Sequence, residues 1–304
     1  SIGKQAFYGT GQANVVIPNS VTNIGDLAFV GINLAAITVD AQNTYYSSLD
    51  GVLFNKSQTT IIQYPGRKAG KSYTVSNSVT TIGTHAFYAC TSLTNVTIGN
   101  SVTSIGYGAF NRCSGLTSVI IPSSATSIGA WTFSSCTSLA SVIIPSSVTS
   151  IGDYAFYYCT ALTSVTIPDS VTNIGDYAFN TCTKLASVYF RGNAPRLAGS
   201  HVFADGNYFT IYYLPGTTGW GTTFGGRPTA LWNPQAEAIG VRTNRFGFTI
   251  TGTSNLFIVV EACTNLGNPS WSPVGTNTLT GGSSYFSDSQ WTNYARRFYR
   301  LRSP

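Results

Sequence analysis

The sequence predicts a repeat solenoid of about 23-residue coils, built mainly from short β-strands with helical turns and followed by a small all-β, sandwich-like domain. The first observation is a column of five cysteines spaced 23 residues apart, within segments that are nearly copies of one another. A fixed period of this size is typical of a solenoid, in which each unit buries its apolar face against its neighbours. The second observation is the loss of the period after Phe190, where short alternating strand candidates take over. The column consists of Cys90, Cys113, Cys136, Cys159 and Cys182.

Each coil carries the same three elements. The segment SVTSIG predicts a first short strand, and GDYAFYYC predicts a helical turn that places its Phe in the core. The segment LTSVTIP alternates apolar and polar residues, which predicts a second strand with Val and Ile inward, ended by the proline. Identical residues of stacked strands should therefore form columns about 4.8 Å apart. The core column of aromatic residues is Phe87, Phe110, Phe133, Phe156 and Phe179.

The chain divides into three parts. We expect the solenoid over residues 1–190, with an irregular inserted coil over 38–75 that contains hairpins around Leu49-Asp50-Gly51 and Pro65-Gly66. Residues 191–232 are expected to form a degenerate last coil and a cap, because the open end of a repeat array must be covered. Residues 233–304 carry four to six strand candidates, which predicts a small β-sandwich module.

Composition limits the function. Only 9% of residues are charged, against about 25% for an average soluble domain, and the net charge is +6. Nucleic-acid binding needs clustered Lys and Arg, so we expect no nucleic-acid partner. No apolar run approaches the roughly 18 residues of a membrane span. The absence of methionine suggests a processed protein or a piece of a longer one, and a removed signal peptide fits an extracellular location.

The repeated units resemble a known family. The pattern SVTSIGxxAFxxCxxLTSVTIPxS, from about Ser78 to Phe190, resembles the BspA-like leucine-rich repeats of bacterial and protist surface proteins. The segment Leu49-Asp50-Gly51-Val52-Leu53-Phe54 looks like a variant seen in that family. The resemblance covers about two thirds of the chain and implies a leucine-rich-repeat solenoid on a secreted or surface-anchored protein. It implies binding to host or matrix proteins, or to other cells, and no catalytic residues. The tail from about Pro234 is similar to β-rich modules of secreted bacterial proteins.

The cysteine column is the first candidate site. Metal binding needs converging ligands, whereas each cysteine is 23 residues from the next and no histidine column accompanies them. Disulfides between coils fit the expected Cα separation, but the number is odd and stacked Cβ atoms lie slightly too far apart. We therefore expect buried thiols that act as small apolar residues, with Cys263 of the tail buried too, and no metal or cofactor.

A second column lies two residues before each core Phe. Aromatic residues on consecutive coils could form a strip that binds sugars or proteins. The alternative is that they shield the coil edge by packing on one another. The column comprises Gln5, Leu27, His85, Gly108, Trp131, Tyr154 and Tyr177, of which His85, Trp131, Tyr154 and Tyr177 are candidates for an interaction surface.

A third column is the outward residue of the LTSVTIP strand. It should expose Ile120, Ile143 and Tyr189, and an exposed apolar ridge of this kind indicates an interaction face. The alternative is ordinary β-propensity on a wetted sheet. The whole column is Val16, Thr38, Thr97, Ile120, Ile143, Thr166 and Tyr189.

The tail segment from Arg296 to Arg302 interleaves four arginines with aromatic residues. It could bind an anionic polysaccharide, or its arginines could protect an exposed edge strand from pairing. Enzymatic motifs are missing from the sequence, and neither His85 nor His201 has an acidic residue close by in the chain. We therefore expect no catalysis.

These observations predict a non-catalytic extracellular interaction or adhesion protein that binds a protein or a polysaccharide through its repeated surface. The alternative is a structural subunit of a filament or surface layer. Ser1-Ile2-Gly3 falls in the middle of a repeat, so the first coil lacks its opening strand and could be completed by another chain. The expected assembly residues are Ser1, Ile2, Arg297, Tyr299 and Arg300.

Overall fold

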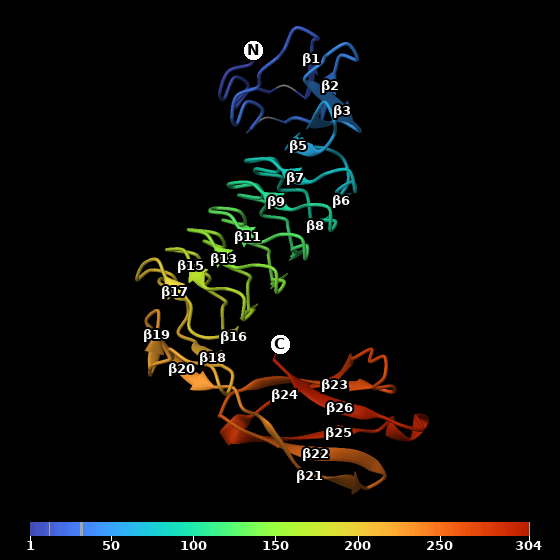
Figure 1. Ribbon diagram of the computed structural model, residues 1–304, viewed down its shortest axis with the longest axis vertical. Coiled ribbons are helices and arrows are strands. Elements are labelled where there is room, and N and C mark those ends of the chain that lie inside the picture. Colours follow the sequence, from blue (N-terminus) through green and yellow to red (C-terminus); the bar gives the residue numbers. More distant parts are fainter. Residues whose placement is uncertain (12, 31–32, 304) are drawn as a thin grey trace.

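The chain forms an elongated β-solenoid with a smaller β-module at its C-terminal end (Figure 1). A computed structural model describes residues 1–11, 13–30 and 33–303, and residues 12, 31–32 and 304 lie outside the described part. The expected fold class is confirmed. In the described part, no helix is long and apolar enough to span a membrane.

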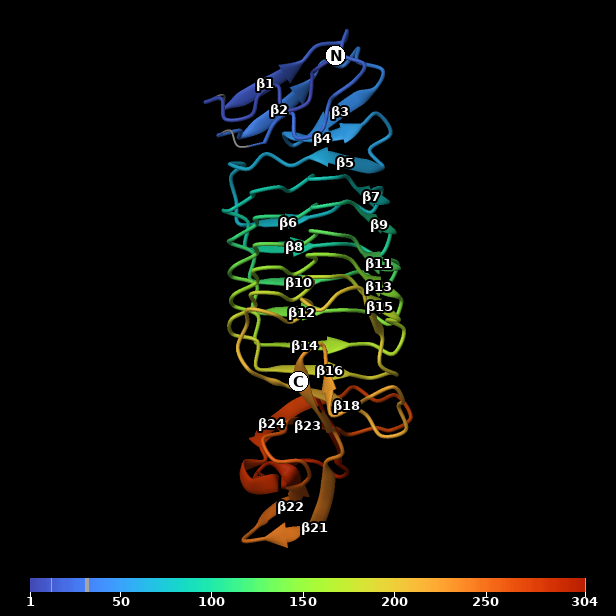
Figure 2. The ribbon, with the colours of Figure 1, turned by 90° about the vertical axis from the view of Figure 1, so that its left-hand side faces the viewer.

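The LTSVTIP strands of successive coils stack along the long axis on one side of the solenoid, which we call the main sheet (Figure 2). They pair in parallel within three separate sheets of two, four and five strands. Partners are spaced one coil apart, so that Val119 lies beside Val142 and Ile120 beside Ile143. Because the strands alternate, the Val side chains enter the core and the Ile side chains face out. The strands are β1 (Asn14–Ile17), β2 (Ala36–Val39), β6 (Ser72–Thr74), β8 (Asn95–Thr97), β10 (Ser118–Ile120), β12 (Ser141–Ile143), β14 (Ser164–Ile167), β16 (Ser187–Phe190), β18 (Thr210–Tyr213) and β20 (Arg227–Leu231), with β19 (Thr223–Phe224) antiparallel to β20.

The SVTSIG segments form a second parallel row of two-residue strands. Its glycines lie where neighbouring coils approach most closely: a Cβ on Gly152 would lie 2.6 Å from the backbone nitrogen of Ala130. In most coils the Ile-Gly pair therefore combines a core residue with a position that has no room for a side chain. The row comprises β7 (Thr81–Ile82), β9 (Ser104–Ile105), β11 (Ser127–Ile128), β13 (Ser150–Ile151), β15 (Asn173–Ile174) and β17 (Arg196–Leu197).

The expectation of a helical turn is wrong. Successive backbone N–H groups of this segment donate alternately to a carbonyl of their own coil and to a carbonyl of the next coil. In the coil around Cys159, every second N–H closes a local turn, as when Tyr157 donates to the carbonyl of Tyr154 at 3.1 Å. The N–H groups between them donate to the next coil, as when Phe156 donates to Ala178 at 2.8 Å. A helix would use all of these groups internally. Left-handed φ angles near +56° and +59° at Tyr154 and Tyr158 make this alternation possible.

The column of core phenylalanines fills the space between the two rows. Phe87, Phe110, Phe133, Phe156, Phe179 and Phe203 are almost fully buried, and successive rings stack with centroids 4.8 to 5.8 Å apart. Each buried aromatic ring of this size contributes about 1.5–3 kcal/mol of hydrophobic free energy. The solenoid is therefore stabilised coil by coil, by contacts between neighbours.

The segment between the early coils and the regular array forms antiparallel hairpins, the first of them at Asp50-Gly51 as expected. The hairpin expected around Pro65-Gly66 is wrong, because the strands on both sides of this turn pair in parallel with the following coils. Strands β3 (Tyr46–Leu49), β4 (Val52–Asn55) and β5 (Thr60–Gln63) are joined to the second row through the parallel pair β5–β7. Leu53 packs in the core of the early coils, whereas Phe54 packs in the core of the regular array. This hairpin thus lies between the two apolar cores and contributes a buried side chain to each.

The C-terminal module consists of two antiparallel sheets that face each other across an apolar core. One sheet has the order β21 (Gln235–Arg242), β22 (Arg245–Thr251), β25 (Ser283–Asp288). The other has the order β24 (Ser272–Thr278), β23 (Phe257–Cys263), β26 (Phe298–Arg302), and two 3-10 turns lie at Thr280–Gly282 and Trp291–Asn293. Residues Phe248, Ile250, Val260 and Phe286 fill the space between them.

Candidate interaction surfaces

The outer face of the main sheet carries an exposed apolar pair. Ile120 of β10 and Ile143 of β12 lie directly beside each other in register, with 62% and 60% of their surfaces exposed. Val16 occupies the same column position on β1 and is 71% exposed. Two adjacent exposed isoleucines on a rigid parallel sheet offer a flat apolar contact area, which we call the Ile120–Ile143 face.

The prediction that Tyr189 is exposed is wrong. Tyr189 on β16 is only 3% exposed, because its ring stacks on Tyr212 of β18 at 5.3 Å and both rings pack into the core of the module. The module therefore covers the C-terminal end of the column, and the chain end lies next to β16 (Figure 2). Between the Ile120–Ile143 face and the module lies a depression lined by Ile143, Pro168, Arg191 and Arg302, among others.

The aromatic column forms a continuous stack along the turn edge of the solenoid. The rings of Trp131, Tyr154 and Tyr177 lie face to face, with centroids 4.2 and 4.7 Å apart and planes within 12°. The stack continues to His201, whose ring lies 4.7 Å from that of Tyr177 at 6°. Because the rings cover one another's faces, the column acts first as a packing element.

His201 was missed in the sequence because its coil is one residue longer than the others. The sequence did contain a signal, since His201 stands two residues before Phe203, as Tyr177 stands two before Phe179. His85 does not join the stack. It packs edge-on against Tyr88 and Tyr107, with centroids 5.6 and 5.4 Å away.

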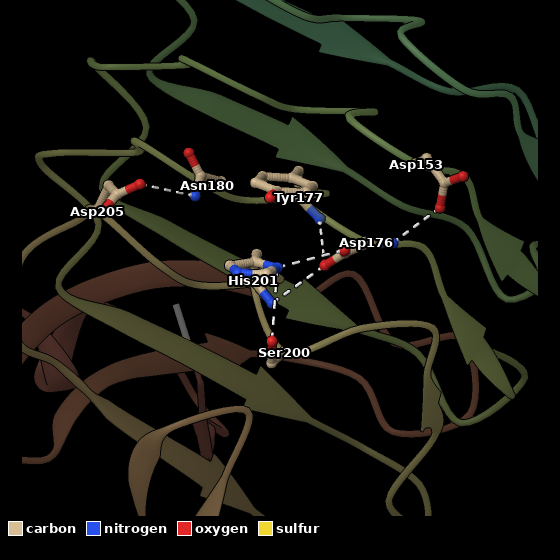
Figure 3. Close-up of polar contacts among 7 residues, drawn as sticks. All are labelled: Asp153, Asp176, Tyr177, Asn180, Ser200, His201 and Asp205. Carbon is tan, nitrogen blue, oxygen red and sulfur yellow. Dashed lines mark hydrogen bonds and ion pairs between the residues drawn. The ribbon is translucent and has the colours of Figure 1, made fainter.

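Both histidines have acidic partners, contrary to the expectation from the sequence. The Nδ1 atom of His85 lies 3.1 Å from Oδ1 of Asp26, from a coil 59 residues earlier. The Nδ1 atom of His201 lies 3.4 Å from Oδ2 of Asp176 (Figure 3). The solenoid brings residues from different coils to the same edge, which a search for neighbours along the chain does not detect.

Aspartates tie the turns of successive coils together along the stack. Oδ1 of Asp153 accepts the N–H of Asp176 at 2.8 Å, and Oδ1 of Asp176 accepts the N–H groups of Tyr177 and His201 at 3.0 Å (Figure 3). These carboxylates therefore satisfy backbone donors of the next coil, which gives them a structural role.

Ser200, His201 and Asp176 lie together but do not have the geometry of a nucleophilic triad. Ser200 Oγ and Asp176 Oδ2 both approach Nδ1 of His201, at 3.5 and 3.4 Å (Figure 3). A triad needs the hydroxyl on one ring nitrogen and the carboxylate on the other, so that a proton can pass through the ring. This cluster therefore lacks that proton path.

The cysteine column lies in the core, and its thiols make hydrogen bonds between coils. The thiol of Cys159 donates to the carbonyl of Phe133 in the preceding coil at 3.2 Å, and Cys113, Cys136 and Cys182 repeat this contact at 2.9 to 3.2 Å. All six cysteines are free and buried. Burial holds the pKa of the Cys159 thiol well above its ordinary value and raises the pKa of Cys182 to about 12. No group of three or more metal-ligating side chains occurs among the described residues.

The arginines of the tail have partners within the module. Arg297 pairs with Asp288 at 3.0 Å, and the hydroxyl of Tyr299 donates to the same carboxylate at 2.9 Å. Arg300 and Arg302 both pair with Glu261, at 2.6 and 2.7 Å. Burial alone would raise the pKa of Glu261, but hydrogen bonds from Arg302 and Arg300 outweigh it and leave the pKa lowered.

The other expected assembly residues lie at the first coil. Ile2 is half-buried and forms a parallel bridge with Ile24, accepting a hydrogen bond from the N–H of Gly25 at 2.8 Å. Ser1 is exposed. The first coil thus continues the second row of the solenoid through Ile2.

Comparisons with known proteins agree with this architecture. The family model of the BspA type leucine rich repeat region matches residues 1–71 and 66–186 in six copies. A leucine-rich cell surface protein from Faecalibacterium prausnitzii is similar in structure, with 37% identity and a TM-score of 0.58 over 62% of this chain and 50% of that one. A leucine-rich repeat protein from Eubacterium ventriosum is 26% identical with a TM-score of 0.51, over 64% of this chain and 59% of its own. This chain thus spans about half the length of the first protein. No curated protein matches the sequence.

Proposed function

Because the chain belongs to the family of BspA-type leucine-rich repeat proteins, we propose that it is a surface-displayed or secreted protein that works by binding other proteins through its repeated sheet. The observation that carries this proposal is the Ile120–Ile143 face, where two large apolar side chains lie side by side and exposed on a rigid sheet. The similar protein from Faecalibacterium prausnitzii is described as a cell surface protein, which supports the proposed location.

The physical argument rests on the cost of keeping these side chains in water. Both isoleucines point away from the core, so they contribute little to folding, and a partner that covered them would gain roughly 25 cal/mol for each Å² of apolar area removed from water. The surrounding Ser and Thr residues of the strands can supply hydrogen bonds at the rim of such a contact. This surface supports a proposed role in adhesion.

The test compares adhesion of the chain and its variants. Beads coated with the chain are added to cultured epithelial cell layers, and the number that remain after washing is counted. The double variant Ile120→Ser, Ile143→Ser should reduce retention by roughly fivefold or more, since central apolar contacts dominate binding energy. Val16→Ser is the matched control, because Val16 is also exposed in this column but lies on β1, in a separate two-stranded sheet.

Equal retention of the double variant and the chain would contradict the proposed face. Retention no higher than that of uncoated beads would contradict adhesion itself. Filaments seen by negative-stain electron microscopy of the chain alone would instead favour the structural-subunit alternative.

A further inference from the structure

Strand β26 of the module has a free edge. It is the last strand of its sheet and pairs with β23 only, so no described strand accepts hydrogen bonds from its other side. Strand β21 ends the opposite sheet in the same way. Between these two edges lies an apolar cavity of about 550 Å³, lined by residues that include Ile239, Phe246, Trp271 and Leu301. The sandwich is therefore open on this side.

Two further depressions share lining residues with this cavity or with each other and lie toward the solenoid. Leu301 also lines a second depression at the junction, together with Tyr189, Trp232 and Arg302. Arg302 and Arg191 line a third, which reaches Ile143 and Pro168 on the main sheet. We call these three neighbouring depressions together, from Trp271 past Leu301 to Arg191, the β26 groove.

Two buried donors that line the groove have no hydrogen-bond partner among the residues that the structure describes. The side chain of Arg297 is only 10% exposed and its Nε pairs with Asp288, but its Nη1 atom is unpaired. Nε1 of Trp232 at the junction is likewise buried and unpaired. An unpaired buried donor costs roughly 1–3 kcal/mol, more for a charged group. An occupant that carries carbonyl or carboxylate oxygens would supply the missing acceptors.

The charge of the groove favours an acidic occupant. Arg191, Arg297, Arg300 and Arg302 line it, and Asp169 is its acidic lining residue. Arg297 pairs with Asp288, whereas Arg300 and Arg302 share the single carboxylate of Glu261. Arg191 is exposed, and within the described ranges no acidic side chain comes within ion-pair distance of it. Four arginines thus stand against the three carboxylates of Asp169, Asp288 and Glu261, which leaves the groove with a net charge of +1.

We propose that the β26 groove binds an extended, acidic segment of a partner protein, which adds as a strand to the free edge of β26. An apolar side chain of that segment fills the cavity beside Trp271, and a carboxylate pairs with Arg191. A free strand edge recognises a peptide backbone through its alternating donors and acceptors, which a polysaccharide lacks. The inference rests on the proposed protein-binding function for the class of partner, but the groove meets the Ile120–Ile143 face at Ile143 alone and does not include Ile120.

The first test uses defined peptides and the whole chain. The probe is the fluorescein-labelled octapeptide Glu-Val-Glu-Thr-Glu-Val-Glu-Thr, followed by fluorescence anisotropy. Its twin with Lys in place of Glu should bind at least about tenfold more weakly, because the charge is reversed. A second control peptide, with the Glu sequence N-methylated at alternate residues, should also bind at least about tenfold more weakly, because it cannot form the strand hydrogen bonds. Hydrogen exchange should show new protection of β26 amides in the presence of the probe.

Variants of the chain locate the site. Arg191→Glu should weaken binding of the probe by about tenfold or more. Arg296→Glu is the matched control, since Arg296 is exposed, close in the chain to β26 and outside the groove, and it should change affinity by less than about twofold. Ile120→Ser should leave probe binding unchanged. A failure of this inference is therefore distinguishable from a failure of the proposed adhesion face.

Three outcomes would overturn the proposal. The first is no binding of the probe at concentrations up to about 1 mM, which corresponds to roughly −4 kcal/mol. The second is equal binding of the Glu and Lys peptides, or equal effects of Arg191→Glu and Arg296→Glu. The third is a dimer in analytical ultracentrifugation that competes with the probe, which would place a second copy of the chain on β26 instead.

Discussion

Tyr154 and Tyr177 stack with their ring centroids 4.7 Å apart and their planes within 4° of parallel. The two rings match because their coils have the same length and both residues adopt φ angles of +56°. This left-handed conformation costs an L-residue about 1–2 kcal/mol, and the contacts between rings offset that cost. The stacked rings thus hold the turn edges of neighbouring coils in register.

Replacing Tyr154 should show how these two effects combine. Tyr154→Ala removes the contacts to Trp131 and Tyr177 and keeps the strained backbone, so the free energy of unfolding should fall by about 2 kcal/mol. Tyr154→Gly removes the same contacts but relieves the strain, so it should cost about 1 kcal/mol less than the alanine variant. Urea unfolding followed by far-UV circular dichroism measures both. An alanine variant as stable as the glycine variant would show that the backbone carries no strain.

Much of this architecture could be predicted from the repeat alone. Because Cys90 to Cys182 are spaced 23 residues apart, equivalent positions of successive coils form columns. The buried Phe and Cys columns and the outward position of Ile120 and Ile143 follow from this period. The turn was harder to predict, because its composition allows a helix. The choice between helix and turns depends on whether the N–H of Phe156 finds a better acceptor in the next coil, as it does in Ala178.

Contacts between the repeated solenoid and the non-repeated module could not be predicted from the sequence. Tyr189 has the same column position as Ile143, and only the docking of the module decides that one is buried and the other exposed. The same holds for the β26 groove, which combines Leu301 with Arg191, more than one hundred residues earlier in the chain. Such contacts depend on tertiary packing, which no repeat pattern encodes.

The glycine of the Ile-Gly pair should tolerate alanine in one coil and not in its neighbour. At Gly152 a Cβ would lie 2.6 Å from the backbone nitrogen of Ala130, so Gly152→Ala must displace a coil and should cost about 2–4 kcal/mol. At Gly129 the nearest atom would be the Thr132 hydroxyl oxygen, at 3.3 Å, so Gly129→Ala should change stability by less than about 1 kcal/mol. Thermal unfolding of the two variants measures both losses of stability. Similar losses in both would show that the spacing between coils is uniform.

The cysteines should be inert until the chain unfolds. The six thiols are buried. Burial raises the pKa of the Cys90, Cys136, Cys159 and Cys182 thiols, the last to about 12, so these four carry almost no thiolate at pH 8. We therefore expect no reaction with a disulfide reagent such as DTNB within minutes in the native state, and six reactive thiols in guanidinium chloride. Rapid reaction of one or more thiols in the native chain would reveal local opening of the corresponding coil.

The module should lose stability in acid through Glu261. The pKa of this carboxyl in the folded chain lies below its ordinary value of 4.5, because Arg302 and Arg300 hydrogen-bond its charged form. The stabilisation is therefore fully present above about pH 4.5 and is lost as the pH falls through the folded pKa. Glu261→Gln should lower the melting temperature at pH 7, and the difference from the unmodified chain should narrow toward pH 3. Glu237→Gln, at an exposed carboxylate that accepts one hydrogen bond from Thr251, is the control and should show a small difference at every pH. If the difference in melting temperature between Glu261→Gln and the unmodified chain stays constant from pH 7 to pH 3, the two arginines do not hold this carboxylate in its charged form.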